Sequence, residues 1–291
     1  MKNLLTPQWH ILGGGFVSSS LEKFAIKNSI PHSVLGRREI NLLNPEKVRE
    51  HFQSIKVPTI VLLPAAISRI RDNSQVSFQK NVEMVRNVVN SINSNIEKIL
   101  FFSSVDVYGN RPNLPITENT SLLPQDYYSL SKIVGEYFTQ IECEKRRVKW
   151  IILRLTGLYG INDKQLSLIG KMFRSAYLDK TVSVTGSSQT KRDYVDVEDL
   201  SRIVYELLKN NCEGIYNVAS GKSYDLLHIA KKIDSFFPAS GIVEQYTEET
   251  NRATELSFNI NKLKKDLPQF KFNSLDNSLQ KYYLKEICQY T

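Results

Sequence analysis

The stretch from Ile99 to Tyr137 constrains the fold most, because it sets an apolar strand, a hydroxyl pair and a helix in a fixed order. It begins with a short apolar run that is typical of a buried strand. Ser103 and Ser104 follow where that strand ends. A polar loop with three prolines then stops regular structure, and a helix begins near Asp126, because a carboxylate suits a helix N-terminus. Parallel α/β sheets bind ligands at the carboxyl ends of their strands, so the stretch predicts a functional site there.

Tyr128 and Lys132 lie one turn apart on the predicted helix and therefore share a face. A free tyrosine has a pKa of about 10. A nearby ammonium favours the phenolate and is expected to lower that pKa. A phenol tuned in this way exchanges a proton with a sugar oxygen while a hydride moves at carbon, and Ser104 would hold the same oxygen by a hydrogen bond. These three residues are the candidate catalytic residues.

The Tyr-x-x-x-Lys spacing is weak on its own, because Tyr205 and Lys209 repeat it. That copy lies towards the end of an amphipathic helix, and no serine-bearing strand end precedes it. We interpret it as a structural helix face. The ordered set of strand, Ser-Ser, Val-Tyr-Gly, proline loop and Tyr-x-x-x-Lys is what distinguishes Tyr128.

A glycine turn follows the first apolar strand, with the pattern Gly13-x-Gly15-x-x-Ser18. A dinucleotide site needs glycine where the backbone meets the pyrophosphate, and a helix N-terminus to meet its charge. Ser18 replaces the usual third glycine, which packs the helix on the strand, so the fingerprint is weaker than the standard one. Its place directly after an apolar strand favours a cofactor site over a flexible turn.

Residues 32–38 indicate a second strand and its end. An NAD site usually has an acidic residue there to bind the ribose 2′-hydroxyl. Gly36 stands at that place and is followed by Arg37 and Arg38. Two guanidiniums suit a 2′-phosphate, and no carboxylate stands there to repel it. We therefore expect NADP(H) as the preferred cofactor and NAD as the alternative. The alternative role for the two arginines is that they are solvated loop residues without a ligand.

Four ordered segments resemble the extended short-chain dehydrogenase/reductase family, in its sugar-nucleotide epimerase, dehydratase and reductase branch: SSVDVYG, LPITENTSLLPQDYYSLSK, LRLTGLYG and KRDYVDVEDLS. The similarity covers nearly the whole chain. It implies an α/β fold, with a Rossmann-type doubly wound parallel sheet over residues 1–160, to which 190–220 returns. Residues 161–291 would form mainly a smaller C-terminal substrate lobe. The apolar patterns predict helices over 76–92 and 165–178.

The resemblance also assigns site residues. It implies cofactor contacts from the glycine turn, the arginine pair, the end of the third strand and the catalytic helix, namely Gly13, Gly15, Phe16, Val17, Arg37, Arg38, Leu63, Ala65, Tyr128 and Lys132. It implies substrate contacts from Ser104, Asp106, Gly157 and Arg192. Gly157 stands where many members have an asparagine. Arg192 matches an arginine that contacts the nucleotide diphosphate, and its alternative role is an ion pair with Asp193 or Asp196.

The activity that the resemblance implies is NADPH-dependent reduction of the 4-keto group of a nucleotide-linked deoxyhexose. The alternative enzyme is a nucleotide-sugar 4-epimerase with tightly bound NAD, since the same three catalytic residues serve both reactions. The alternative from another class is a cofactor-binding regulatory protein of the same fold. Dehydration is not expected, because Val105 stands where dehydratases have an acid and Asp106 replaces the longer glutamate.

Composition agrees with a cytoplasmic globular enzyme. The 291-residue chain has three distant cysteines, which fit a reducing compartment, and four scattered histidines without metal-ligand spacing. No signal segment or membrane-spanning run is expected. The net charge of +8 suits anionic nucleotide ligands or plain solubility, and it does not require nucleic acid as a partner. The resemblance implies a homodimer through helices near 85–95 and 126–145.

Overall fold

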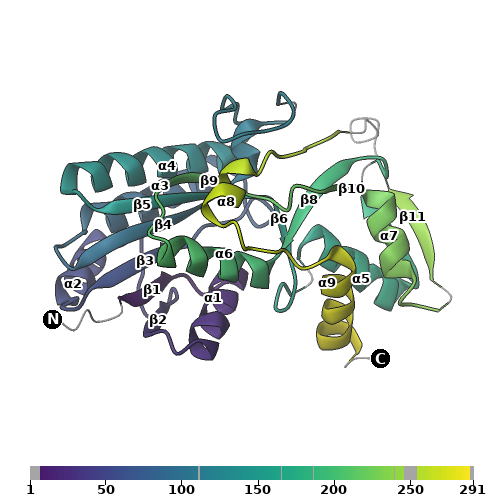
Figure 1. Cartoon of the computed structure of the whole chain (residues 1–291), viewed down its shortest axis with the longest axis horizontal. Helices are drawn as coiled ribbons and strands as arrows, with labels where there is room; N and C mark the ends of the chain where they lie inside the picture. Colours follow the sequence, from purple (N-terminus) through teal and green to yellow (C-terminus); the bar gives the residue numbers. More distant parts are fainter. Residues whose placement is uncertain are drawn as a thin grey trace. The chain divides into compact units, whose positions relative to one another are not determined.

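The computed structural model describes residues 7–110, 112–164, 166–185, 187–238, 240–245 and 254–288. The chain divides into two compact units, whose elements are labelled in Figure 1. The first unit comprises Met1–Gly109, Ser121–Leu155 and Leu207–Tyr216. The second comprises Asn110–Thr120, Thr156–Glu206 and Asn217–Thr291. The assignment of a cofactor lobe and a substrate lobe to the chain stays a prediction.

A six-stranded sheet organises the first unit, with the strand order β2-β1-β3-β4-β5-β9. Its strands are β1 (Gln8–Leu12), β2 (His32–Leu35), β3 (Thr59–Leu63), β4 (Ile96–Ser104), β5 (Lys149–Leu155) and β9 (Gly214–Val218). β1 pairs in parallel with β2 and β3, and β4 pairs in parallel with β3 and β5. Because the strand order reverses at β1, the switch point lies at the carboxyl ends of β1 and β3. The predicted Rossmann-type α/β sheet is confirmed.

Four helices accompany this sheet: α1 (Phe16–Lys27), α2 (Pro45–Ser54), α3 (Gln75–Asn90) and α4 (Tyr127–Arg146). α3 and α4 lie side by side, and α4 packs on β4 and β5 (Figure 1). The predicted start of α4 is confirmed, since the Asp126 carboxylate accepts a hydrogen bond from the Ser129 backbone N–H at 2.7 Å. This cap fixes where the helix begins, and hence where its first side chains point.

α4 approaches β4 most closely at Gly135. A Cβ atom at this position would lie 2.5 Å from Cζ of Phe101, whose side chain is only 1% exposed. Because a buried ring has little room to move, the close approach depends on glycine. Lys132 and Tyr128, about one and two turns earlier on α4, are thereby brought over the end of β4.

The second unit contains two small sheets. The three-stranded sheet has the order β10-β8-β6, and the two-stranded sheet pairs β11 with β7. Their strands are β6 (Gly157–Tyr159), β7 (Thr181–Thr185), β8 (Lys191–Asp196), β10 (Ser223–Asp225) and β11 (Gly241–Gln245). The helices that begin in this unit are α5 (Leu168–Asp179), α6 (Val197–Lys209), α7 (Leu226–Asp234), α8 (Asn261–Asp266) and α9 (Leu275–Tyr282), followed by a π-helical turn over Tyr283–Ile287.

The helix predicted over 165–178 is α5, which begins later, at Leu168. The Ser167 hydroxyl accepts a hydrogen bond from the Gly170 N–H at 2.8 Å, so this serine caps the helix. Residue 165 lies outside the described residues. Apolar side chains of α5, α7 and α9 form the core of the second unit, with Phe173, Ile229 and Leu279 fully buried. In the described part of the chain, no helix is long and apolar enough to cross a membrane.

Candidate functional site

The glycine turn joins β1 to α1 and leaves the first turn of α1 without a side-chain cap. The other helices of the first unit are each capped by a side chain, from Asn44, Ser74 and Asp126. Gly13 has a φ of +140°, and a Cβ there would lie 3.3 Å from the backbone nitrogen of Ala65. At Gly15 a Cβ would meet no described heavy atom within 4 Å. The uncapped N–H groups and this open space fit the pyrophosphate of a dinucleotide.

The end of β2 carries the exposed pair Arg37 and Arg38, together with a carboxylate that the sequence analysis missed. Gly36 lies against the glycine turn, since a Cβ on Gly36 would sit 3.7 Å from Cα of Gly14. The Glu39 carboxylate folds back to within 3.0 Å of that same Cβ position. Glu39 therefore reaches the place from which an acidic residue binds the ribose of NAD. A carboxylate three residues after a strand-ending glycine was the available sequence signal.

The end of β3 lies beside the glycine turn. The backbone N–H of Ala65 donates to the carbonyl of the last β1 residue at 3.1 Å. Leu63, a predicted cofactor contact, is fully buried in the apolar core. Phe16 and Val17 are half-buried at the start of α1. Gly13 and Ala65 thus meet at the switch point, where doubly wound folds hold their dinucleotide.

The two serines at the end of β4 make different contacts. Ser103 donates to the Glu136 carboxylate at 2.5 Å. Ser104 is 9% exposed and accepts a hydrogen bond from the Asp106 backbone N–H at 3.2 Å. That bond opens a short 3-10 turn over Val105–Tyr108. Ser103 is therefore part of the internal support, whereas Ser104 presents a hydroxyl that can donate to a ligand oxygen.

Tyr128 is the second residue of α4, and its backbone N–H donates to Oδ1 of Asn73 at 3.0 Å. Burial raises the pKa of the Tyr128 phenol above its ordinary value. Asp106 and Asp126 also raise this pKa, and the Arg69 guanidinium lowers it. The expectation that the pKa of Tyr128 lies below its ordinary value is wrong for this chain, because burial outweighs the Arg69 guanidinium, which lowers that pKa.

Lys132 is 4% exposed, and its Nζ donates to the Phe102 carbonyl oxygen at 2.6 Å. The same Nζ lies 5.5 Å from the centroid of the Tyr128 ring. Burial lowers the pKa of Lys132 to about 8, although the Glu136 carboxylate raises it. An ammonium with this pKa can release and regain a proton near neutral pH.

A buried ion pair between Glu136 and Arg154 lies close to Lys132. Glu136 lies one turn after Lys132 on α4, and its Oε2 is 2.7 Å from Nη2 of Arg154 on β5. The two side chains are only 5% and 4% exposed. Arg154 also donates to the Tyr108 hydroxyl at 2.9 Å. Strand, helix and turn are therefore joined through buried charged groups, and Arg154 has a structural role.

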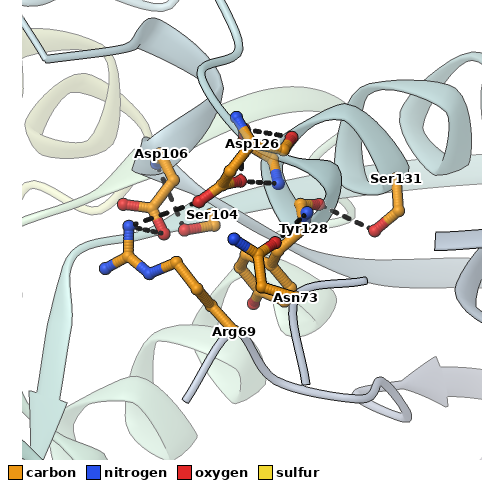
Figure 2. A network of polar contacts seen from close by, with 8 residues as sticks. Arg69, Asn73, Ser104, Asp106, Asp126, Tyr128 and Ser131 are labelled. Atoms are coloured by element: carbon orange, nitrogen blue, oxygen red, sulfur yellow. Dashed lines mark hydrogen bonds and ion pairs between the residues drawn. The ribbon is translucent and has the colours of Figure 1, made fainter. Parts of the chain in front are cut away.

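Figure 2 shows the polar contacts around the start of α4. Nη1 of Arg69, from the loop between β3 and α3, lies 3.7 Å from Oδ2 of Asp106 and 3.6 Å from Oδ2 of Asp126. Asn73 of the same loop accepts the hydrogen bond from Tyr128. Sequence analysis missed both loop residues, because an irregular loop has no periodicity that reveals where its side chains point.

Gly157 and Arg192 belong to the second unit. A Cβ on Gly157 would lie 2.7 Å from a ring carbon of Tyr194, so the pairing of β6 with β8 depends on glycine there. Arg192 donates to the Thr254 carbonyl at 3.0 Å and to the Thr254 hydroxyl at 2.6 Å. Asp193, an alternative partner of Arg192, accepts backbone hydrogen bonds from residues 220–222 at 2.8 to 3.1 Å.

The described residues contain no group of three or more His, Cys, Asp or Glu side chains that could hold a metal ion. Cys143, Cys212 and Cys288 remain thiols. Burial raises the pKa of the Cys143 thiol to about 12, which makes it a poor nucleophile.

Residues 9–219 match the model of the NAD dependent epimerase/dehydratase family. The match begins in β1 and includes the glycine turn, Ser104, Tyr128 and Lys132. The chain belongs to the NAD dependent epimerase/dehydratase family. Because members of this family are NAD(P)-dependent enzymes, the expectation of an enzyme is confirmed, and the regulatory alternative is set aside.

Two curated relatives and one solved structure illustrate the likeness. The dTDP-4-dehydro-6-deoxyglucose reductase of Escherichia coli is 31% identical over 143 residues, which are 47% of this chain and 45% of that protein, less than half of either. The GDP-L-fucose synthase of Sinorhizobium fredii is 25% identical over 235 residues, covering 74% of this chain and 75% of that protein. An epimerase of Methanothermobacter thermautotrophicus has a TM-score of 0.87 at 19% identity, with 98% of this chain and 93% of that chain covered. This last likeness shows the fold alone.

The buried pair beneath the site predicts a specific loss of stability. Glu136→Gln leaves the Arg154 charge without its carboxylate, so we expect the free energy of unfolding to fall by about 3–5 kcal/mol. Glu142→Gln makes the same change in a pair whose Lys145 partner is 63% exposed, and such ion pairs contribute about 1 kcal/mol or less. Urea unfolding of both variants measures the difference, and equal losses would contradict the structural role of the Glu136–Arg154 pair.

Proposed function

We propose that this enzyme is an NADPH-dependent reductase of the 4-keto group of a nucleotide-linked deoxyhexose. The position of Lys132 carries the proposal, because its Nζ donates to the Phe102 carbonyl at 2.6 Å, two residues before Ser104, and lies 5.5 Å from the Tyr128 ring centroid. The two curated relatives support the substrate class, since one is named as a reductase of a dTDP-linked keto sugar and the other as a GDP-L-fucose synthase.

The catalytic side chains would divide the reaction between them. When bound, the nicotinamide cofactor supplies a hydride to C4 of the sugar. Tyr128 donates its phenolic proton to the C4 oxygen as negative charge develops there, so that the ketone becomes an alcohol. Ser104 donates a hydrogen bond to the same oxygen and orients it. The Lys132 ammonium stabilises the phenolate that remains, and it also binds the nicotinamide ribose.

The remaining assigned residues would bind the substrate. Asp106 lies two residues beyond Ser104 and would accept a hydrogen bond from a sugar hydroxyl. Arg192 would contact the nucleotide diphosphate, for which a guanidinium is well suited. Gly157 would present only its backbone to the sugar, because the Tyr194 ring occupies the space that a side chain would need there. In this proposal residues 161–291 supply most of the substrate lobe.

The cofactor preference depends on opposing charges at the end of β2. Arg37 and Arg38 favour the 2′-phosphate of NADPH. The Glu39 carboxylate, which reaches Gly36, favours the free hydroxyl of NAD. Glu39 therefore keeps a second candidate, a nucleotide-sugar 4-epimerase with tightly bound NAD. We favour the reductase because the two exposed guanidiniums outnumber the one carboxylate, which leaves a net positive charge for the 2′-phosphate of NADPH.

Substitution of the phenol tests the proposed proton transfer. We expect Tyr128→Phe to lower kcat for NADPH oxidation, with dTDP- or GDP-linked 4-keto-6-deoxyhexose as substrate, by about 100-fold or more. NADPH binding should change less than about twofold, because the hydroxyl acts on the substrate. Tyr127→Phe removes an exposed hydroxyl one residue earlier and should keep full activity. A Tyr128→Phe enzyme with wild-type kcat would exclude Tyr128 as the proton donor.

Fluorescence titration with NADPH and NADH tests the cofactor assignment. We expect the wild type to bind NADPH about tenfold or more tightly than NADH, a difference of about 1.4 kcal/mol. Arg37→Ala combined with Arg38→Ala should abolish that preference, whereas Glu39→Gln should increase it. Arg49→Ala, on the exposed face of α2, is the control.

The as-purified protein should contain no tightly held cofactor when it is denatured and its small molecules are identified by mass spectrometry. Stoichiometric NAD, together with weak NADPH binding, would instead support the epimerase.

A further inference from the structure

The loop between β3 and α3, residues 64–74, is held at two points near the catalytic helix. Ile67 and the Asn81 side chain of α3 exchange two hydrogen bonds, of 2.7 and 3.0 Å. Asn81 is only 5% exposed, so this tie is internal. At the other end of the loop, Asn73 accepts the Tyr128 backbone N–H at 3.0 Å. The loop is therefore fixed to α3 and α4, and the residues between its two ties have a defined position.

Arg69 lies between these two ties and reaches towards the start of α4 (Figure 2). Its Nη1 is 3.7 Å from one Asp106 carboxylate oxygen and 3.6 Å from one Asp126 carboxylate oxygen. Both distances are longer than a hydrogen bond, and the Arg69 side chain is 52% exposed. The guanidinium is thus shared between two carboxylates from different elements and is not locked to either.

Charged side chains from three segments act on the phenol of Tyr128. Asp106 comes from the turn after β4, Asp126 caps α4, and Arg69 comes from the loop. Lys132, on α4 itself, has its Nζ 5.5 Å from the ring centroid and donates to a backbone carbonyl. Each carboxylate opposes the formation of negative charge on the phenol, whereas a cation favours it. Arg69 lowers the pKa of Tyr128, whereas Asp106 and Asp126 raise it.

We propose that Arg69 is a positioning residue whose guanidinium offsets the charges of Asp106 and Asp126, so that the Tyr128 phenol releases its proton more readily. This inference rests on the proposed role of Tyr128 as the proton donor to the C4 oxygen. Asp106 is then available to the sugar hydroxyl, and Asp126 caps α4, without preventing the proton transfer. The loop ties explain why the guanidinium stays beside these two carboxylates.

Titration of the phenol without cofactor or substrate tests the charge effect directly. The protein is labelled with 3-fluorotyrosine, whose phenol is more acidic, and ¹⁹F NMR follows each ring as the pH rises. The resonance of residue 128 is assigned by its absence from Tyr128→Phe. We expect Arg69→Gln to raise the pKa of this ring by about 0.5 unit or more, because a neighbouring cation is removed. Arg71→Gln, an exposed arginine of the same loop, should leave it unchanged.

A compensating variant separates the charge effect from damage to the loop. Asp126→Asn removes one carboxylate charge and keeps a good N-cap, since asparagine caps helices about as well as aspartate. In the Arg69→Gln background, Asp126→Asn should therefore return the pKa of residue 128 towards its wild-type value. An unchanged titration in Arg69→Gln, or a shift that Asp126→Asn does not reverse, would overturn the proposal.

The active enzyme provides an independent readout. Because protonated Tyr128 is the proposed acid, activity falls as the pH rises through its pKa. Arg69→Gln should move this alkaline limb of the kcat profile to higher pH, lower the plateau, and change KM less than about twofold. A large rise in KM with an unmoved limb would mean that Arg69 binds substrate and would overturn the proposal. Absence of reductase activity in the wild type would refute the proposed function, whereas the NMR titration would still decide the role of Arg69.

Discussion

The buried ammonium of Lys132 is the constraint on which the arrangement of the first unit depends. Removing a cation from water is costly unless nearby groups replace its hydration. Here the Phe102 carbonyl accepts a hydrogen bond from Nζ, and the Glu136 carboxylate lies one turn away with Arg154 as its partner. These compensating groups come from β4, α4 and β5. Burial of the Lys132 ammonium therefore requires that the helix be packed on the sheet in this position. Gly135 makes the required approach sterically feasible.

The same burial that holds Lys132 works against the chemistry proposed for Tyr128. Removing water raises the pKa of the phenol and lowers that of the lysine, so the neutral form of each side chain is favoured. The proposed reaction needs the opposite at the moment of proton transfer, when the phenolate must be stabilised. The Arg69 guanidinium from the loop lowers the pKa of the phenol and so opposes the effect of burial. The Lys132 Nζ lies 5.5 Å from the centroid of the same ring.

Local signals were readable in the sequence, whereas contacts between distant segments were not. The strand before Ser104 and the cap at Asp126 depend on apolar pattern and capping chemistry over a few residues, and both were predicted. Glu39 and Arg69 reach the site because loops fold back, which no spacing reveals. The direction of the Tyr128 pKa was predicted wrongly, because the Tyr-x-x-x-Lys spacing shows the neighbouring charge and does not show the burial.

Following the hydride tests the proposed function most directly. The enzyme would be incubated with each stereoisomer of NADPH deuterated at C4 of the nicotinamide and with a nucleotide-linked 4-keto-6-deoxyhexose, and the product sugar analysed by NMR and mass spectrometry. We predict that one stereoisomer places one deuterium at C4 of the sugar for each NADP⁺ released. No transfer of deuterium to C4 of the sugar from either stereoisomer would contradict a reductase that consumes NADPH.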